Sequence, residues 1–174
     1  MILVIGERIN DPLMKLDRVR TWKYMWRCEN AIRFIMTTPG MVYGPTRASL
    51  LKLLGTEPDR IINLLPPDSK SGSWDIKLAE ESANTLVKFL WTEEGKKWDR
   101  VILLGRRVAE AFQYHTGKME FGSDCHLASS KILVLPHPSG RSTVLNDPAR
   151  WQSYHQIAKE FHGRCEHASE TRAA

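Results

Sequence analysis

Cysteine is scarce in this chain. Its three cysteines, Cys28, Cys125 and Cys165, lie far apart among 174 residues and form no Cys-x-x-Cys pair. A zinc or iron–sulfur site made from four cysteines of one chain is therefore excluded, and a framework of disulfides is not expected. We expect no metal ion and no cofactor.

Long apolar runs are absent as well. No stretch approaches the roughly 20 residues of a membrane-spanning helix. The apolar start, Met1 to Ile5, is too short for a secretory signal peptide. We therefore expect a soluble, cytoplasmic protein with no membrane partner. The sequence contains no internal repeat.

The composition is that of a globular protein. Apolar residues make up 42% of the chain and charged residues 26%, values that are common in domains with a buried core. The net charge is +5, which weakly favours an anionic partner such as nucleic acid. We expect one domain over 1–163, a flexible tail over 164–174, and a monomer.

Four short apolar segments predict buried parallel strands, because each ends at a glycine, a proline or a polar turn. They are Ile2–Ile5, Arg60–Leu65, Arg100–Leu104 and Ile132–Leu135. Apolar residues at helical spacing lie between them. They predict one helix that ends at Gly55 and others over 75–91, 108–114 and 148–161. Alternating strands and helices predict an α/β fold with a parallel sheet.

Unusual loops follow all four predicted strands. They read GERIND from Gly6, NLLPPD from Asn63, GRRV from Gly105 and PHPSGRS from Pro136. The carboxyl ends of parallel strands lie at one edge of a sheet, and ligands bind at that edge in open α/β folds. We therefore expect the four loops to form one pocket that contains an amide, an imidazole and several charges.

The order of these motifs resembles that of the uracil-DNA glycosylase superfamily. The matching pieces are a polar first loop, an aromatic residue before a helix, an asparagine at the end of the second strand and a late His-Pro-Ser loop. They read Gly6-Glu7-Arg8-Ile9-Asn10, Tyr43, Asn63 and His137-Pro138-Ser139-Gly140-Arg141-Ser142. The stretch VILLGRRVAEAF is also similar to the family's third strand, glycine turn and helix. The resemblance covers about residues 1–160 and implies a divergent member without iron–sulfur cysteines.

This resemblance implies a three-layer α/β/α fold around a four-stranded parallel sheet. It also implies a DNA glycosylase of base-excision repair. Such an enzyme flips a damaged or modified pyrimidine of the uracil type out of duplex or single-stranded DNA and hydrolyses its N-glycosidic bond. The implied partner is therefore DNA that carries a modified pyrimidine.

The resemblance implies candidate residues for base release and base recognition, and their chemistry suits these roles. Negative charge develops on the leaving pyrimidine, so a hydrogen-bond donor near its carbonyl lowers the barrier. His137, between Pro136 and Pro138, is the candidate donor, and the alternative is a turn histidine bonded to backbone. Asn63 offers a donor and an acceptor to the amide edge of a pyrimidine, although asparagine also ends strands for turn reasons. Tyr43 is the candidate stacking aromatic, with a tyrosine at the edge of the core as the alternative.

The last loop carries the candidate contacts to DNA, Ser139, Gly140, Arg141 and Ser142. Arg141 stands where the family often has a leucine that enters the duplex once the base has flipped out. The serines can donate to phosphates, and Gly140 allows close approach of the backbone. The alternative for Arg141 is a solvated loop arginine.

The first loop departs from the family pattern. Members commonly have an aspartate or asparagine two residues after the glycine, and here that residue is Arg8. Asp11 is then the candidate carboxylate, followed by Asn10 and Glu7, although Glu7 can instead orient the loop from behind. Gly6 and Arg8 are candidate base contacts, and Arg8 can also contact phosphate. Arg8 keeps one alternative open, an altered member that binds or processes a modified base without simple repair. A separate alternative is a nucleotide-binding α/β protein that makes no contact with DNA.

Overall fold

The computed structural model describes residues 1–8, 45–65, 74–138 and 143–163. The chain forms two compact units. Unit 1 comprises Met1–Val42 and Pro58–Leu135, and unit 2 comprises Tyr43–Glu57 and Pro136–Ala174. The expectation of a single domain over 1–163 stays a prediction. None of the described helices has the length and apolar character needed to cross a membrane.

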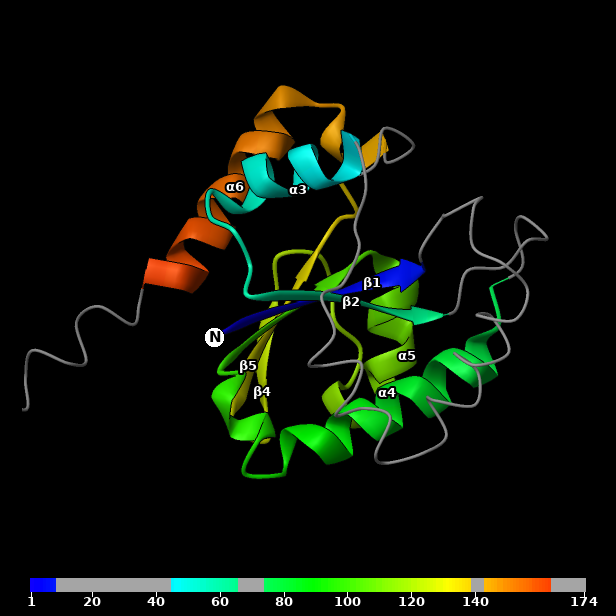
Figure 1. The fold of residues 1–174 in the computed structure, drawn as a ribbon. Helices are drawn as coiled ribbons and strands as arrows, with labels where there is room; N and C mark the ends of the chain where they lie inside the picture. The colour runs from blue at the N-terminus through cyan, green and yellow to red at the C-terminus, as the bar shows by residue number, and fades with distance from the viewer. Residues whose placement is uncertain (9–44, 66–73, 139–142, 164–174) are drawn as a thin grey trace, which may run out of the picture. The chain divides into compact units, whose positions relative to one another are not determined.

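Unit 1 is built on a five-stranded sheet with the strand order β2-β1-β3-β5-β4 (Figure 1). The strands are β1 Ile2–Arg8, β2 Arg60–Leu65, β3 Arg100–Leu104, β4 Asp124–Leu127 and β5 Ser130–Leu135. β1, β2, β3 and β5 run parallel, whereas β4 pairs antiparallel with β5. The chain is therefore an α/β protein, and the prediction of four parallel strands is confirmed.

Two features of the sheet correct the prediction. The sheet has a fifth strand, β4, which forms a hairpin with β5. Leu127 is the only buried residue of β4, so hydrophobic periodicity did not indicate a strand there. The first strand also continues to Arg8, because Arg8 pairs with Leu65 of β2. The first half of the predicted GERIND loop, Gly6 to Arg8, is thus strand.

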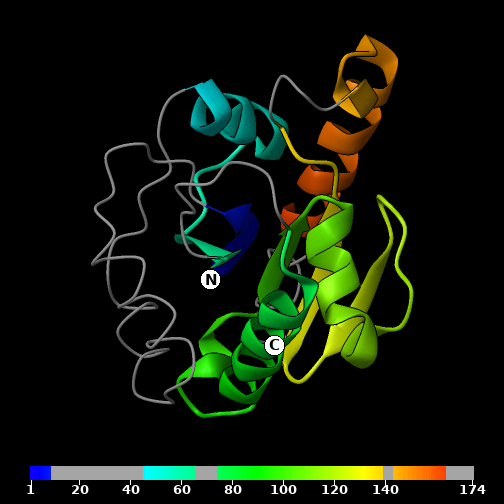
Figure 2. The same cartoon turned by 90° about the vertical axis from the view of Figure 1, so that its right-hand side faces the viewer.

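Two helices of unit 1, α4 (Ile76–Leu90) and α5 (Arg106–Thr116), pack on one face of the sheet (Figures 1 and 2). The carboxylate of Asp75 caps α4 by accepting a hydrogen bond of 3.1 Å from the N–H of Leu78. α5 begins directly after β3, with Gly105 as its N-cap. The φ of Gly105 is +94°, a backbone conformation that favours glycine. Both helices were predicted from helical periodicity.

Side chains alternate along the strands and make both faces of the sheet apolar. One face packs against α4 and α5 through a single buried cluster. From the strands the cluster includes Leu3, Ile5, Ile62, Leu64, Val101, Leu103, Ile132 and Val134. The residues that alternate with them point to the other face and are also buried; they include Val4, Ile102, Leu133 and Leu135. A strand that is buried on both faces appears in the sequence as a continuous apolar run, which explains why these strands were recognisable.

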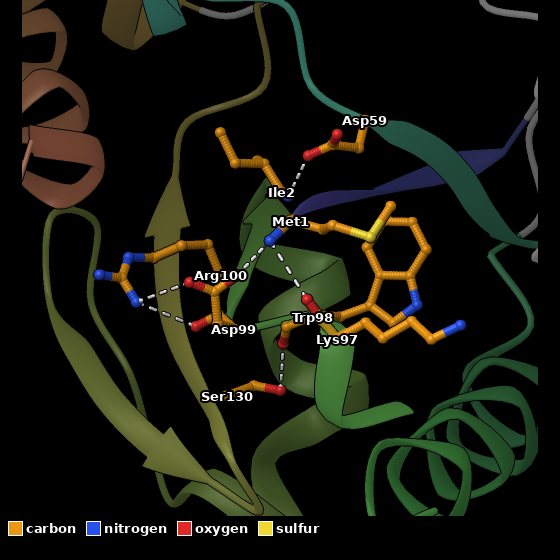
Figure 3. A network of polar contacts seen from close by, with 8 residues as sticks. All are labelled: Met1, Ile2, Asp59, Lys97, Trp98, Asp99, Arg100 and Ser130. Carbon is orange, nitrogen blue, oxygen red and sulfur yellow. Dashed lines mark hydrogen bonds and ion pairs between the residues drawn. The ribbon is translucent and has the colours of Figure 1, made fainter. Parts of the chain in front are cut away.

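Polar contacts close the amino edge of the sheet (Figure 3). The ammonium group of Met1 donates a hydrogen bond of 3.1 Å to the Lys97 carbonyl and forms an ion pair with the Asp99 carboxylate. The N–H of Ile2 donates to the Asp59 carboxylate at 2.6 Å. This edge therefore serves to hold the strands together, and a ligand site is expected at the opposite, carboxyl edge.

Unit 2 contains α3 (Pro45–Leu54) and α6 (Pro148–Gly163), which pack side by side (Figure 1). Both helices were predicted from the sequence. His155 of α6 joins them, because its Nδ1 lies 2.9 Å from the carbonyl oxygen of Leu53 in the last turn of α3. A carbonyl oxygen can only accept, so Nδ1 carries the proton. The His155 ring also stacks on Trp151, with 5.2 Å between ring centroids.

Candidate functional site

Gly6 and Asn63 occupy paired positions on β1 and β2. A Cβ atom added to residue 6 would lie 2.4 Å from Oδ1 of Asn63. The amide of Asn63 therefore lies across the space that glycine leaves open. Asn63 is buried, with 8% of its surface exposed. The two residues form a single structural feature at the carboxyl-terminal half of both strands.

Asn63 lies inside β2 and not at its end. The family resemblance implied an asparagine that ends the second strand, but β2 has the bounds predicted from the apolar run and continues through Leu64 to Leu65. Ile62 and Leu64 enter the cluster under α4 and α5, so Asn63 between them points to the other face of the sheet. A turn does not explain this asparagine. Asparagine is depleted in strands, and a buried one that breaks the local pattern is typical of a functional position.

Glu7 lies on the face of the sheet opposite to the Asn63 amide. Its carboxylate accepts a hydrogen bond of 2.9 Å from Nη1 of Arg107, in the first turn of α5. The guanidinium of Arg107 also lies over the ring of Trp74, with Cζ 5.9 Å from the ring centroid. Of the two roles expected for Glu7, this geometry favours orientation of the chain from behind rather than direct chemistry.

The first turn of α5 is basic. Arg106 and Arg107 are both exposed and directly follow Gly105, whose N–H donates to the Leu135 carbonyl at 2.8 Å. Cations at a helix N-terminus oppose the helix dipole at a cost of about 0.3–1 kcal/mol each. Contacts with aromatic rings offset part of this cost, since Arg106 lies 6.0 Å from the Phe121 centroid. The arginines thus stand where local helix preferences disfavour them, at the carboxyl edge of the sheet.

His137 follows β5 in the chain, after Leu135 and Pro136. Its side chain is partly buried, while Pro136 and Pro138 on either side are buried. The two prolines restrict the backbone next to the imidazole, as the sequence suggested. The contacts between His137 and a base stay a prediction.

Much of the predicted site lies outside the described residues. This applies to Asn10, Asp11, Tyr43, Ser139, Gly140, Arg141 and Ser142, and to the side chain of Arg8. Among the described candidates, the structure brings Gly6 and Asn63 together and places Glu7 on the opposite face. The part of the chain that the structure describes contains no group of three or more His, Cys, Asp or Glu side chains arranged to hold a metal ion.

Sequence reasoning missed Arg107 and Trp74 as residues of this edge. The available signal was GRRV itself, since two arginines follow a glycine where the first turn of a helix normally favours acidic residues. The partner of Arg107 could not be read from the sequence, because Glu7 lies 100 positions away.

Comparison of the chain with protein-family models and with curated proteins finds no match. The resemblance to the uracil-DNA glycosylase superfamily therefore rests on the motifs of the sequence alone.

Proposed function

We propose that this chain is a DNA glycosylase that flips a uracil-type pyrimidine out of DNA and hydrolyses its N-glycosidic bond. The observation that carries the proposal is the buried Asn63 amide, which lies across Gly6 near the carboxyl edge of a parallel sheet. Burying a side-chain amide in an apolar strand costs stability unless the amide has hydrogen-bond partners. Recognition of a base edge gives a reason to keep it there.

The chemistry of an amide fits a uracil-type base. Uracil presents an N3–H donor beside carbonyl acceptors, and asparagine offers a matching carbonyl oxygen and NH₂ group. Cytosine presents the opposite pattern at the same atoms. A side chain held in one orientation therefore discriminates between them, and the close contact with Gly6 supports such an orientation.

The proposal includes the three-layer α/β/α fold of the superfamily. Its supports are the parallel arrangement of β2, β1, β3 and β5, the packing of α4 and α5 on one face, and the buried apolar side chains on the other face. A sheet that is apolar on both faces is covered on both sides in α/β proteins.

The proposed roles of the remaining residues follow the resemblance. His137 donates to the carbonyl of the leaving base, and Asp11, with Asn10 as the alternative, stabilises the sugar cation or positions water. Tyr43 stacks on the flipped base. Arg141 occupies the gap in the duplex, which offsets a few kcal/mol of lost stacking.

The test is release of base from labelled oligonucleotides that carry one uracil, 5-hydroxymethyluracil or mismatched thymine, in single and double strands. Abasic sites are detected by alkaline cleavage. The wild-type protein should release at least one of these bases. Asn63→Asp should change the base preference, because it replaces a donor by an acceptor. Asn84→Asp is the matched control, since Asn84 is an exposed amide on α4.

Two outcomes count against the proposal. Unchanged base choice in Asn63→Asp would remove the recognition role of Asn63. Selective binding of a modified base without release from any substrate would favour the altered family member that Arg8 suggests.

A further inference from the structure

The end of β1 is held unevenly by its neighbours. Pairing between β1 and β2 continues to Arg8↔Leu65, whereas pairing between β1 and β3 ends at Ile5↔Leu103. On the β3 side, the chain turns at Gly105 into α5. The backbone ladder therefore supports Gly6, Glu7 and Arg8 from the β2 side alone.

Arg107 reaches β1 where this pairing stops. It stands in the first turn of α5 and binds the Glu7 carboxylate at 2.9 Å, and its guanidinium lies over Trp74, just before α4. One side chain thus connects the segments that follow β2 and β3 to the end of β1. A planar guanidinium suits this arrangement, because it can bind a carboxylate in its plane and stack on a ring with its face.

We propose that Arg107 is a positioning residue of the base-recognition site and that it acts through Glu7. Neighbouring residues of a strand point to opposite faces, so restraining the Glu7 side chain on one face restrains the rotation of the strand. That rotation sets where Gly6 meets the amide of Asn63, a contact without room for a Cβ atom. The consequence for catalysis rests on the proposed function.

If the pair of Arg107 and Glu7 had a purely structural role, its loss would lower the global stability of unit 1. The side chains of Arg107 and Glu7 are 53% and 30% exposed, and ion pairs of this kind add little to global stability. Loss of the pair should therefore appear as local loosening of β1 and misplacement of Asn63, not as unfolding of the sheet.

The experiment compares Arg107→Met with Arg106→Met. Both variants remove one exposed positive charge from the first turn of α5, but only Arg107 contacts Glu7. Three quantities are measured: hydrogen exchange of the amides of residues 6–8, the dissociation constant for a duplex with one uracil–guanine pair, and the single-turnover rate of uracil release from that duplex.

We expect Arg107→Met to speed amide exchange over residues 6–8 while the rest of β1 and β3 stays protected. It should slow uracil release roughly tenfold or more, because small displacements of a positioning group carry large rate costs, with the dissociation constant little changed. Arg106→Met should leave both exchange and the release rate near the wild-type values. Glu7→Gln should behave as Arg107→Met does, and the double variant should be no worse than either single variant.

Equal loss of rate in Arg106→Met and Arg107→Met would show that charge alone matters and would overturn the inference. Unchanged amide exchange over residues 6–8 in Arg107→Met would overturn it as well, whatever the activity. If the wild-type protein releases no base, the proposed function fails, while the exchange measurement still decides whether Arg107 holds β1.

Discussion

Gly6 and Asn63 restrict each other's identity. They are paired across β1 and β2, and the Asn63 Oδ1 atom lies 2.4 Å from the position that a Cβ of residue 6 would occupy. Real Cβ atoms do not approach an oxygen this closely, so any side chain at position 6 must displace the amide. The contact places a flexible residue and a buried polar residue together in the middle of apolar strands, where neither is favoured by strand propensity.

Gly6→Ala should therefore act through Asn63. We expect it to lower the free energy of unfolding by about 1–3 kcal/mol, the usual range for overpacking. It should also impair base discrimination as Asn63→Ala does. Urea unfolding of the single and double variants gives the coupling, and Gly6→Ala should cost less when Asn63 is already alanine.

Gly163→Ala is the control for this change, because a Cβ at residue 163 meets no atom within 4 Å. It should leave the unfolding midpoint nearly unchanged. Additive effects of Gly6→Ala and Asn63→Ala would contradict the coupling between them.

The strands were predictable to the extent that both of their faces are buried. After their first arginine, RVILL is a continuous apolar run and RIINLL is an apolar run interrupted by Asn63, and both strands have the bounds that were expected. The helix α4 was predictable because Asp75 and its apolar spacing mark its start and its buried side. β4 carries one buried residue and owes its conformation to backbone pairing with β5. This pairing has no signature in the sequence of β4.

The site was predictable only in part, because strand register joins residues far apart in the chain. Asn63 stands out in the sequence as a polar residue in an apolar run. Its contact with Gly6 depends on the pairing of β1 with β2, which no local pattern specifies. The same holds for Glu7 and Arg107, which are 100 positions apart. The sequence identified residues with suitable chemistry, but strand pairing in the folded sheet determines on which face each of them lies.

Asp99 should make the stability of unit 1 depend on pH. Partial burial acts to raise the pKa of Asp99, but the hydrogen bond from the Met1 ammonium group and its positive charge outweigh this effect. The pKa of Asp99 in the folded protein is therefore below its ordinary value of 3.8. Because the pKa is lowered, the stabilisation that the ionised Asp99 carboxylate gives the folded protein is fully present above pH 3.8. It is lost as the pH falls through the lower pKa that Asp99 has in the folded protein.

Asp99→Asn should accordingly lower the free energy of unfolding at pH 7 by roughly 0.5–1 kcal/mol, a small effect because the ion pair is partly exposed. The difference in free energy of unfolding between the variant and the wild type should become smaller as the pH falls below 3.8. Urea titrations between neutral and acidic pH measure it, with Glu110→Gln, an exposed carboxyl on α5, as control. A difference that is constant down to the lowest pH would contradict this assignment.

His155→Ala should destabilise unit 2. The variant loses the hydrogen bond from Nδ1 to the Leu53 carbonyl and the stacking of the ring on Trp151. A carbonyl in the last turn of α3 then lacks its partner, so we expect a loss of roughly 1–2 kcal/mol. Thermal unfolding followed by circular dichroism measures the loss. His126→Ala is the control, because His126 is exposed on β4, and equal losses in both variants would refute the role of His155.

His137→Ala tests the proposed chemistry most directly. His137 is partly buried and lies in the chain between two buried prolines, which restrict the backbone that carries the imidazole before charge develops on a leaving base. Loss of one such preorganised donor typically costs about 10²–10³ in rate. We therefore expect single-turnover release of base to slow by that factor while the dissociation constant for DNA changes little, since the donor acts on charge that exists only in the transition state. His137→Gln should recover part of the rate by supplying an amide donor, and His126→Ala should retain the full rate. A protein that releases base at the wild-type rate after His137→Ala does not use this histidine as its donor.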